Sequence, residues 1–95
     1  MAETTVELRN PTGLHARPAA TFVKAATRFK SDIRVVNITR DAERSAAAKS
    51  MLGVLGLGVV KGHTIRISAE GEDADEAVAA LRELVESGLG ETISE

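Results

Sequence analysis

Apolar and polar residues alternate along two short segments of the chain, and a third segment is rich in β-branched side chains. Within residues 4–10, Val6 and Leu8 fall on one side of an extended chain, and residues 63–69 repeat this pattern. Residues 32–38 carry the β-branched run. Alternation with a period of two is typical of a strand that buries one face, and β-branched residues favour strands. All three segments are therefore predicted to be strands.

Two other segments repeat their apolar residues at the spacing of an α-helix. The first begins near Pro18, which suits a first helical turn because its missing N–H has no partner there. Its apolar positions are Ala19, Phe22, Val23, Ala26 and Phe29. The second begins at Asp73, with Glu76 placed as in a capping box and Gly88 marking the end. Its apolar stripe consists of Ala74, Ala77, Val78, Leu81, Leu84 and Val85.

The region between these elements is harder to assign. Residues 44–48 are rich in alanine, which favours a helix, but the segment is short enough to be a strand. Ser50 is a good N-cap for a short helix from residue 51 to about residue 55. Residues 89–95 look like a polar tail. An antiparallel or mixed sheet with helices on one face would bury every apolar stripe within a single domain, residues 1–95.

Composition and charge exclude several classes of function. The chain has 95 residues, a formal net charge of −2 and no Trp or Tyr, which argues against nucleic acid as a partner. It has no cysteine, and its two histidines lie far apart, so we expect neither a metal site nor a cofactor. No apolar run is long enough for a secretory signal or a membrane span. We therefore expect a cytoplasmic protein that does not insert into membranes.

The segment GLHARPAA, residues 13–20, contains the candidate chemistry. His15 directly precedes the first predicted helix, whose first amides have no partner within the helix and carry a partial positive charge. A phosphate on His15 would lie over the N–H groups of Ala16 and Arg17, and the Arg17 guanidinium matches phosphate oxygens. The same positive surroundings disfavour an imidazolium, which leaves a lone pair for attack on phosphorus. A lone histidine in a turn is more often a surface residue, but this complete segment favours a nucleophile.

This segment resembles the active-site signature of the HPr family, the histidine-containing phosphocarriers of the bacterial phosphoenolpyruvate-dependent sugar phosphotransferase system. The run KSMLGVLGLG, residues 49–58, resembles the family's regulatory serine region, and residues 67–73 resemble the approach to its final helix. The likeness covers nearly the whole chain. It implies an α+β fold, an open-faced β-sandwich in which a four-stranded antiparallel sheet carries three helices on one face in the order βαββαβα. Residues 44–48 would then be a strand.

The resemblance also implies a function. His15 would accept a phosphoryl group from enzyme I, on its Nδ1 atom, and donate it to sugar-specific enzyme II components, and Arg17 would stabilise the phosphate. The protein would then be a stoichiometric carrier rather than an enzyme with its own turnover. We also expect it to be a monomer. Ser50 matches the serine that an ATP-dependent HPr kinase/phosphorylase modifies in many relatives. An N-cap role explains this serine equally well, and both roles are compatible.

Docking residues are expected around the histidine. An apolar surface patch would bind partners, although some of its side chains could instead pack into the core; its members are Met51, Leu52 and Leu55. Lys24 and Lys49 would form a basic rim that recognises acidic partners, together with Arg28, for which a plain solvated position is an equal alternative. His63 lies in no motif and is expected to be structural.

Other functions remain open at this stage. The loop around residues 39–44 is longer than in typical HPr relatives, and insertions of this kind cost little stability. An HPr-like regulatory phosphorelay protein that is not dedicated to sugar transport could have the same sequence. A general-base enzyme at His15 is disfavoured because no Asp or Glu is close to it in sequence, and the acidic balance disfavours an RNA-binding module.

Overall fold

The structure is a computed structural model that describes residues 1–91. Within this range the chain forms four strands and three helices in the order βαββαβα. The elements are β1 (Ala2–Glu7), α1 (Ala16–Ala26), β2 (Asp32–Asn37), β3 (Ser45–Ala47), α2 (Met51–Gly56), β4 (Thr64–Glu70) and α3 (Ala74–Glu86). The predicted order of elements is confirmed, including the strand within residues 44–48.

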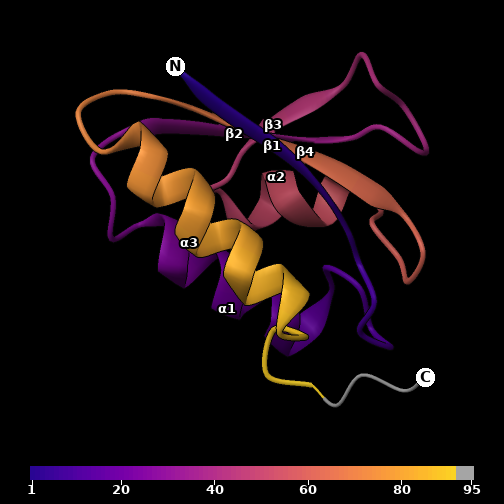
Figure 1. Ribbon diagram of the computed structural model, residues 1–95. Helices are drawn as coiled ribbons and strands as arrows, with labels where there is room; N and C mark the ends of the chain where they lie inside the picture. The colour runs from indigo at the N-terminus through magenta and orange to yellow at the C-terminus, as the bar shows by residue number, and fades with distance from the viewer. Residues whose placement is uncertain (92–95) are drawn as a thin grey trace.

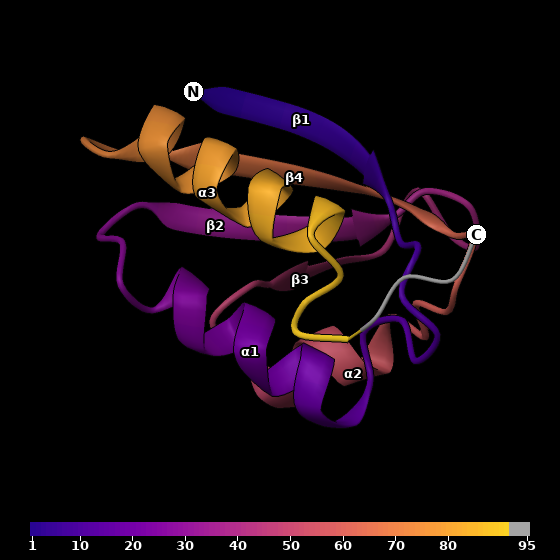
Figure 2. The same ribbon diagram turned by 60° about the horizontal axis from the view of Figure 1, so that its bottom comes forward.

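The four strands form one antiparallel sheet in the order β1-β4-β2-β3. All three helices lie on the same face of this sheet, which leaves the opposite face open (Figures 1 and 2). Burial alternates along β4, where Ile65, Ile67 and Ala69 face the helices. Only one face of the sheet is covered by helices, which explains why apolar and polar residues alternate along residues 63–69. The predicted open-faced β-sandwich is confirmed.

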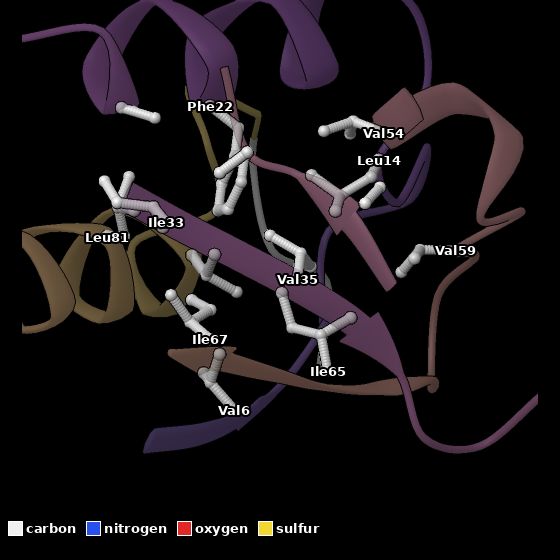
Figure 3. Close-up of a cluster of buried hydrophobic side chains, with 14 of the residues drawn as sticks. Val6, Leu14, Phe22, Ile33, Val35, Val54, Val59, Ile65, Ile67 and Leu81 are labelled. Atoms are coloured by element: carbon white, nitrogen blue, oxygen red, sulfur yellow. The ribbon is translucent and has the colours of Figure 1, made fainter. Parts of the chain in front are cut away.

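The core fills the space between the sheet and the helices. Figure 3 shows Phe22 of α1 and Leu81 of α3 close to the strand side chains of Val35, Ile33 and Ile67. Each of these five side chains is almost fully buried. Burial of one such side chain stabilises the fold by about 1.5–3 kcal/mol. Phe22 is the largest fully buried side chain of α1. It therefore fixes how the helix that follows His15 packs on the sheet.

Several boundaries differ from the predicted ones. The first strand is Ala2–Glu7 rather than residues 4–10, although the Leu8 N–H still donates to the His63 carbonyl at 2.8 Å. Helix α1 begins at Ala16 rather than at Pro18, so the proline occupies the third helical position. This position is still in the first turn, where a missing N–H breaks no hydrogen bond within the helix.

The capping box predicted at the start of the last helix is wrong. The Asp73 side chain makes no capping hydrogen bond with α3. Its carboxylate accepts hydrogen bonds from the backbone N–H groups of Lys30 and Ser31, at 2.8 and 2.9 Å, and from the Ser31 hydroxyl. Asp73 therefore ties the start of α3 to the loop between α1 and β2. A local capping pattern could not anticipate donors that lie more than forty residues away in sequence.

The polar tail predicted for residues 89–95 is wrong in its first part. Leu89 is 1% exposed and belongs to the core, and Glu91 makes side-chain hydrogen bonds to the loop that precedes α1. Residues 92–95 lie outside the described residues. The end of α3 is therefore followed by an ordered segment, residues 88–91, which packs against the rest of the domain.

The long loop of residues 39–44 packs over the end of α2. Backbone N–H groups of Arg40 and Asp41 donate to the Asn37 carbonyl, at 3.2 and 2.9 Å. The Arg40 guanidinium reaches the Leu57 carbonyl, which also accepts from the Asn37 side chain at 3.2 Å. A cation at the C-terminal end of a helix is favourable. The expectation that the fold accommodates the longer loop is consistent with these contacts.

We predict that Asp73 makes stability depend on acid pH. The hydrogen bond from the Ser31 hydroxyl, followed by those from backbone amides, lowers the Asp73 pKa below its usual value of 3.8. A carboxylate with a lowered pKa contributes stability that is present above its usual pKa and is lost as the pH falls through the folded-state pKa. The difference in unfolding free energy between wild type and Asp73→Asn should therefore shrink as the pH falls below about 3.8.

Denaturant unfolding between pH 7 and pH 2 measures this difference. Asp75→Asn is the matched control, because Asp75 is an exposed residue in the first turn of the same helix. An Asp73→Asn difference that is independent of pH would contradict the assignment.

Candidate functional site at the start of helix α1

His15 is the N-cap residue of α1. Its backbone is extended, with φ of −134° and ψ of 161°, and its side chain is half-buried and makes no capping hydrogen bond. At many helix starts, a side-chain oxygen of the N-cap residue accepts a hydrogen bond from one of the first amides. The imidazole is therefore not used to hold the helix, and the helix start keeps its capacity to bind an anion.

The N–H groups available to an anion belong to Ala16 and Arg17. Pro18 has no N–H, and the Ala19 N–H is directed to the His15 carbonyl at 3.4 Å. Because the first four amides of a helix lack intrahelical partners, this leaves two next to the imidazole. The sequence prediction named the same two residues. A phosphate on His15 would be within the positive end of the helix dipole.

Ala16 has an unusual backbone conformation. Its φ is 51°, in the left-handed region, and it is exposed. A residue with a Cβ atom in this region costs roughly 1–2 kcal/mol relative to the right-handed conformation. The neighbouring contacts that hold the loop must offset this cost, because nothing in an alanine side chain favours it. Backbone strain of this kind concentrates at functional sites.

Arg17 is exposed and is available for an incoming anion. Neither of the two ion pairs within residues 1–91 involves it. Arg17 borders a surface depression of about 540 Å³ that lies between the start of α1 and the segment after α3. Its lining consists of Pro11, Thr12, Ala16, Arg17, Pro18, Leu89, Gly90 and Glu91. Arg17 thus lies two residues after His15, and its guanidinium is paired with no carboxylate of residues 1–91.

The residues before His15 are held against the loop that follows α2. The Leu14 side chain is fully buried, and its N–H donates to the Val59 carbonyl at 3.0 Å. Gly13 has φ of +67°, and a Cβ atom there would lie 2.5 Å from the Val59 carbonyl oxygen. Only glycine tolerates both the positive φ and this close approach. The imidazole is therefore attached to a loop whose position is fixed up to the preceding residue.

Asn10, Thr12 and Glu91 form a second support for the loop, which the sequence analysis missed. Asn10 is fully buried, and its Nδ2 donates to the Gly13 carbonyl at 3.0 Å and to Glu91 Oε1 at 2.9 Å. The Thr12 N–H donates to Glu91 Oε1 at 3.0 Å, and the Thr12 hydroxyl donates to Oε2 at 2.7 Å. These hydrogen bonds, from Asn10 first and then from Thr12, lower the Glu91 pKa below its usual value of 4.5.

Ser50 is the N-cap of α2, as predicted. Its Oγ accepts a hydrogen bond from the Gly53 N–H at 3.0 Å. The adjoining apolar residues are Met51, Leu52 and Leu55. Met51 and Leu55 are half-buried and pack against the core, whereas Leu52 is 83% exposed. The expected apolar patch is thus one exposed leucine with two partly covered neighbours.

The predicted basic residues lie away from the histidine. Lys24 is exposed in the last turn of α1, about 14 Å along the helix axis from His15. The Lys49 ammonium donates to the Phe29 carbonyl at 2.7 Å, beyond the same end of α1. Lys24 and Lys49 therefore lie toward the C-terminal end of α1, and an electrostatic role for them would act there.

His63 has structural contacts, in agreement with its expected role. Its Nδ1 lies 3.0 Å from Asn37 Nδ2 and 3.3 Å from the Val60 backbone nitrogen. Both Asn37 Nδ2 and the Val60 N–H can donate to Nδ1 when this ring nitrogen carries no hydrogen. His63 links the end of β2 to the turn before β4.

Residues 1–91 contain no cluster of three or more side chains suited to a metal ion. No helix in this part of the chain is both long and apolar enough to cross a membrane. Within that range, His15 and Arg17 lie at a helix start whose first amides can bind an anion.

Fold and site together define a class of small α+β domain that presents a histidine at the start of its first helix. A family model described as "PTS HPr component phosphorylation site" matches residues 2–87. The chain therefore belongs to the HPr family of the phosphotransferase system, as the resemblance of its motifs indicated.

Individual relatives support this assignment. Phosphocarrier protein HPr of Vibrio cholerae is 46% identical over 86 residues, which are 90% of this chain and 96% of that protein. The crystal structure of HPr-C-His from Thermoanaerobacter tengcongensis matches with a TM-score of 0.90 and 46% identity, over 98% of this chain and 100% of that chain. The multiphosphoryl transfer protein of Haemophilus influenzae is 44% identical over 90 residues, which are 95% of this chain but 18% of that protein. This chain thus spans about a fifth of the length of the multiphosphoryl transfer proteins it matches.

We predict that Gly13→Ala is more destabilising than Gly62→Ala. Both glycines have a positive φ, of +67° and +92°, so each substitution incurs a backbone cost of roughly 1–2 kcal/mol. At Gly62 nothing lies within 4 Å of the added methyl group, whereas at Gly13 it meets the Val59 carbonyl oxygen. Overpacking of this kind adds about 1–3 kcal/mol.

Denaturant unfolding of the two variants gives the comparison directly. Equal losses of stability would show that the approach of Gly13 to Val59 does not constrain the loop.

Proposed function

We propose that this protein is a phosphocarrier in which His15 accepts a phosphoryl group from enzyme I and passes it to sugar-specific enzyme II components. The observation that carries the proposal is the N-cap position of His15, whose imidazole makes no cap while the amides of Ala16 and Arg17 have no partner within the helix. The name of the Vibrio cholerae relative, a phosphocarrier protein, supports the same function.

The transfer is a displacement at phosphorus. A lone pair on the neutral imidazole, at Nδ1, forms the new P–N bond while the bond between phosphorus and the donor breaks, and the donor leaves with that electron pair. The hydrogen on the other ring nitrogen stays in place. Transfer to the acceptor repeats these steps with His15 as the leaving group. No net oxidation or hydrolysis occurs.

The helix start contributes electrostatic stabilisation rather than covalent chemistry. The N–H groups of Ala16 and Arg17 and the Arg17 guanidinium meet the charge on the phosphoryl oxygens. Because Arg17 is exposed, this stabilisation is moderate and partly screened by solvent. A carrier benefits from a moderate effect, since it must release the group to the next acceptor.

Incubation with phosphoenolpyruvate and enzyme I should add one acid-labile phosphate to the wild-type protein, and His15→Ala should abolish this labelling, because the nucleophile is removed. His63→Asn is the matched control. Its side-chain oxygen can accept the hydrogen bonds that reach His63 Nδ1, and it should label like wild type. Intact-protein mass spectrometry before and after mild acid measures the phosphate.

The same assay tests Arg17. Loss of a charge-assisted hydrogen bond should slow transfer in Arg17→Gln by roughly 10- to 100-fold with the fold unchanged. Undiminished labelling of His15→Ala would refute the assignment of the nucleophile, and an unchanged rate in Arg17→Gln would remove the role of the guanidinium.

We also propose that Ser50 is a regulatory phosphorylation site for an ATP-dependent HPr kinase/phosphorylase. Its position supports this, because Ser50 Oγ lies at the start of α2, next to the exposed Leu52. A phosphate there would add a dianion beside the apolar residues expected to dock partners. The positive end of the helix dipole would tolerate this charge, and the same phosphate would interfere with docking at the apolar residues.

A cognate kinase and ATP should give an acid-stable phosphate that is absent in Ser50→Asn. Asparagine has no hydroxyl but retains an N-cap acceptor, so this variant avoids the loss of about 1 kcal/mol expected for Ser50→Ala. Labelling that persists in Ser50→Asn, or no labelling of the wild type by the kinase, would rule out this site.

A further inference from the structure

The segment after α3 is directed back toward the start of α1. Three consecutive residues have positive φ, Gly88 at 94°, Leu89 at 54° and Gly90 at 88°. The Leu89 side chain is buried, its N–H donates to the Leu84 carbonyl at 3.1 Å, and the Glu91 N–H donates to the Gly88 carbonyl at 2.9 Å. Figure 2 shows this segment, in yellow, leaving α3 toward α1. Glu91 is therefore held in place by its own segment.

The Glu91 carboxylate meets three donors of the loop before His15. Both of its oxygens are used, Oε1 by Asn10 Nδ2 and the Thr12 N–H, and Oε2 by the Thr12 hydroxyl. Hydrogen bonds to a carboxylate are roughly twice as strong as those between neutral groups. The carboxylate thus joins residues that are about eighty positions apart in sequence.

The orientation of the Asn10 amide depends on this carboxylate. Asn10 Nδ2 faces the Gly13 carbonyl and Glu91 Oε1, which leaves Asn10 Oδ1 as a buried oxygen without a hydrogen-bond partner. A buried unsatisfied oxygen costs free energy. The two acceptors outweigh this cost, and without Glu91 one of them is lost. The bond that fixes the Gly13 carbonyl, two residues before His15, is therefore coupled to Glu91.

Glu91 also lies near the residue expected to bind phosphate. Arg17 and Glu91 line the same depression, yet no ion pair joins them within residues 1–91. Because the oxygens of Glu91 are occupied by Asn10 and Thr12, the carboxylate is satisfied by the loop. The Arg17 guanidinium therefore remains available for the phosphoryl group.

We propose that Glu91 is a positioning residue for phosphoryl transfer, a carboxylate latch that holds the His15 loop through Asn10 and Thr12 and leaves Arg17 uncommitted. This inference rests on the proposed phosphocarrier function. Glu91 itself does not touch the reacting atoms. Its effect is on the geometry from which His15 attacks and on the availability of the guanidinium.

Glu91→Gln tests the latch, with Glu86→Gln as the matched control. Glu86 is an exposed residue near the same end of the chain, and its described side-chain contact is with Arg82 at 3.6 Å. The first measurement is amide hydrogen exchange by NMR on the unphosphorylated protein. The Thr12 N–H should exchange faster in Glu91→Gln than in wild type or Glu86→Gln. The glutamine side chain has one acceptor oxygen, whereas Asn10 and Thr12 donate to two carboxylate oxygens in the wild type.

The second measurement is the rate of phosphoryl transfer from phosphorylated enzyme I. With this protein as the substrate of phosphorylated enzyme I, Glu91→Gln should lower kcat by about fivefold, as for the loss of one hydrogen bond, with the KM for this protein unchanged. Glu91→Asp, which keeps the charge, should recover part of this loss. A purely structural role would lower the denaturation midpoint without this change in kcat or this recovery.

The outcomes separate the two proposals. If the wild type transfers phosphate while Glu91→Gln matches Glu86→Gln in Thr12 exchange or in kcat, the latch is wrong and the carrier function stands. If the wild type takes up no phosphate on His15, the carrier function fails and the positioning role fails with it.

Discussion

The unpaired amides at the start of α1 are the constraint on which the site depends. A helix start normally satisfies one of these groups with the side chain of its N-cap residue. Here the N-cap is His15, whose imidazole does not cap, and Pro18 and the His15 carbonyl account for the next two positions. The partial positive charge of the helix start therefore remains at the surface, where Ala16 and Arg17 offer their N–H groups. A phosphate on His15 would lie close to this partial positive charge.

Keeping such a helix start in place requires support from outside the helix. Phe22 anchors α1 on the sheet, but it lies two turns further on and does not set the conformation of the loop before it. Two distant segments do this. In the loop after α2, the Val59 carbonyl accepts a hydrogen bond from the Leu14 N–H. In the segment after α3, the Glu91 carboxylate accepts hydrogen bonds from Asn10 and Thr12. These contacts between distant segments of the chain offset the free-energy cost of the left-handed φ of Ala16. The four-stranded sheet brings these segments, which are far apart in sequence, to the same end of the domain.

Local patterns predicted what depends on local physics. Alternation located β1 and β4, β-branched residues located β2, the spacing of apolar residues located α1 and α3, and the hydroxyl of Ser50 does cap α2 as expected. Propensity left residues 44–48 undecided, because strand β3 forms only by pairing with β2. The misassigned Asp73 and the missed Glu91 have a common cause. Each carboxylate has a plausible local interpretation, as a cap or as part of a polar tail, but binds donors far away in sequence. The position of His15 directly before α1, with Arg17 two residues further on, could be predicted because it requires no long-range contact.

The direction of α2 decides what a docking partner would meet. Lys49 before α2 reaches Phe29 beyond the end of α1, and Val59 after α2 bonds Leu14 before the start of α1, so the two helices run antiparallel. The start of α2, with its exposed Leu52, is therefore displaced along α1 from the histidine. A partner that binds both His15 and Leu52 must cover the adjacent faces of both helices rather than a ring centred on the imidazole. Single exposed leucines supply little area, so affinity would have to come from this wider surface, and a charge added at the start of α2 would change docking without altering the nucleophile.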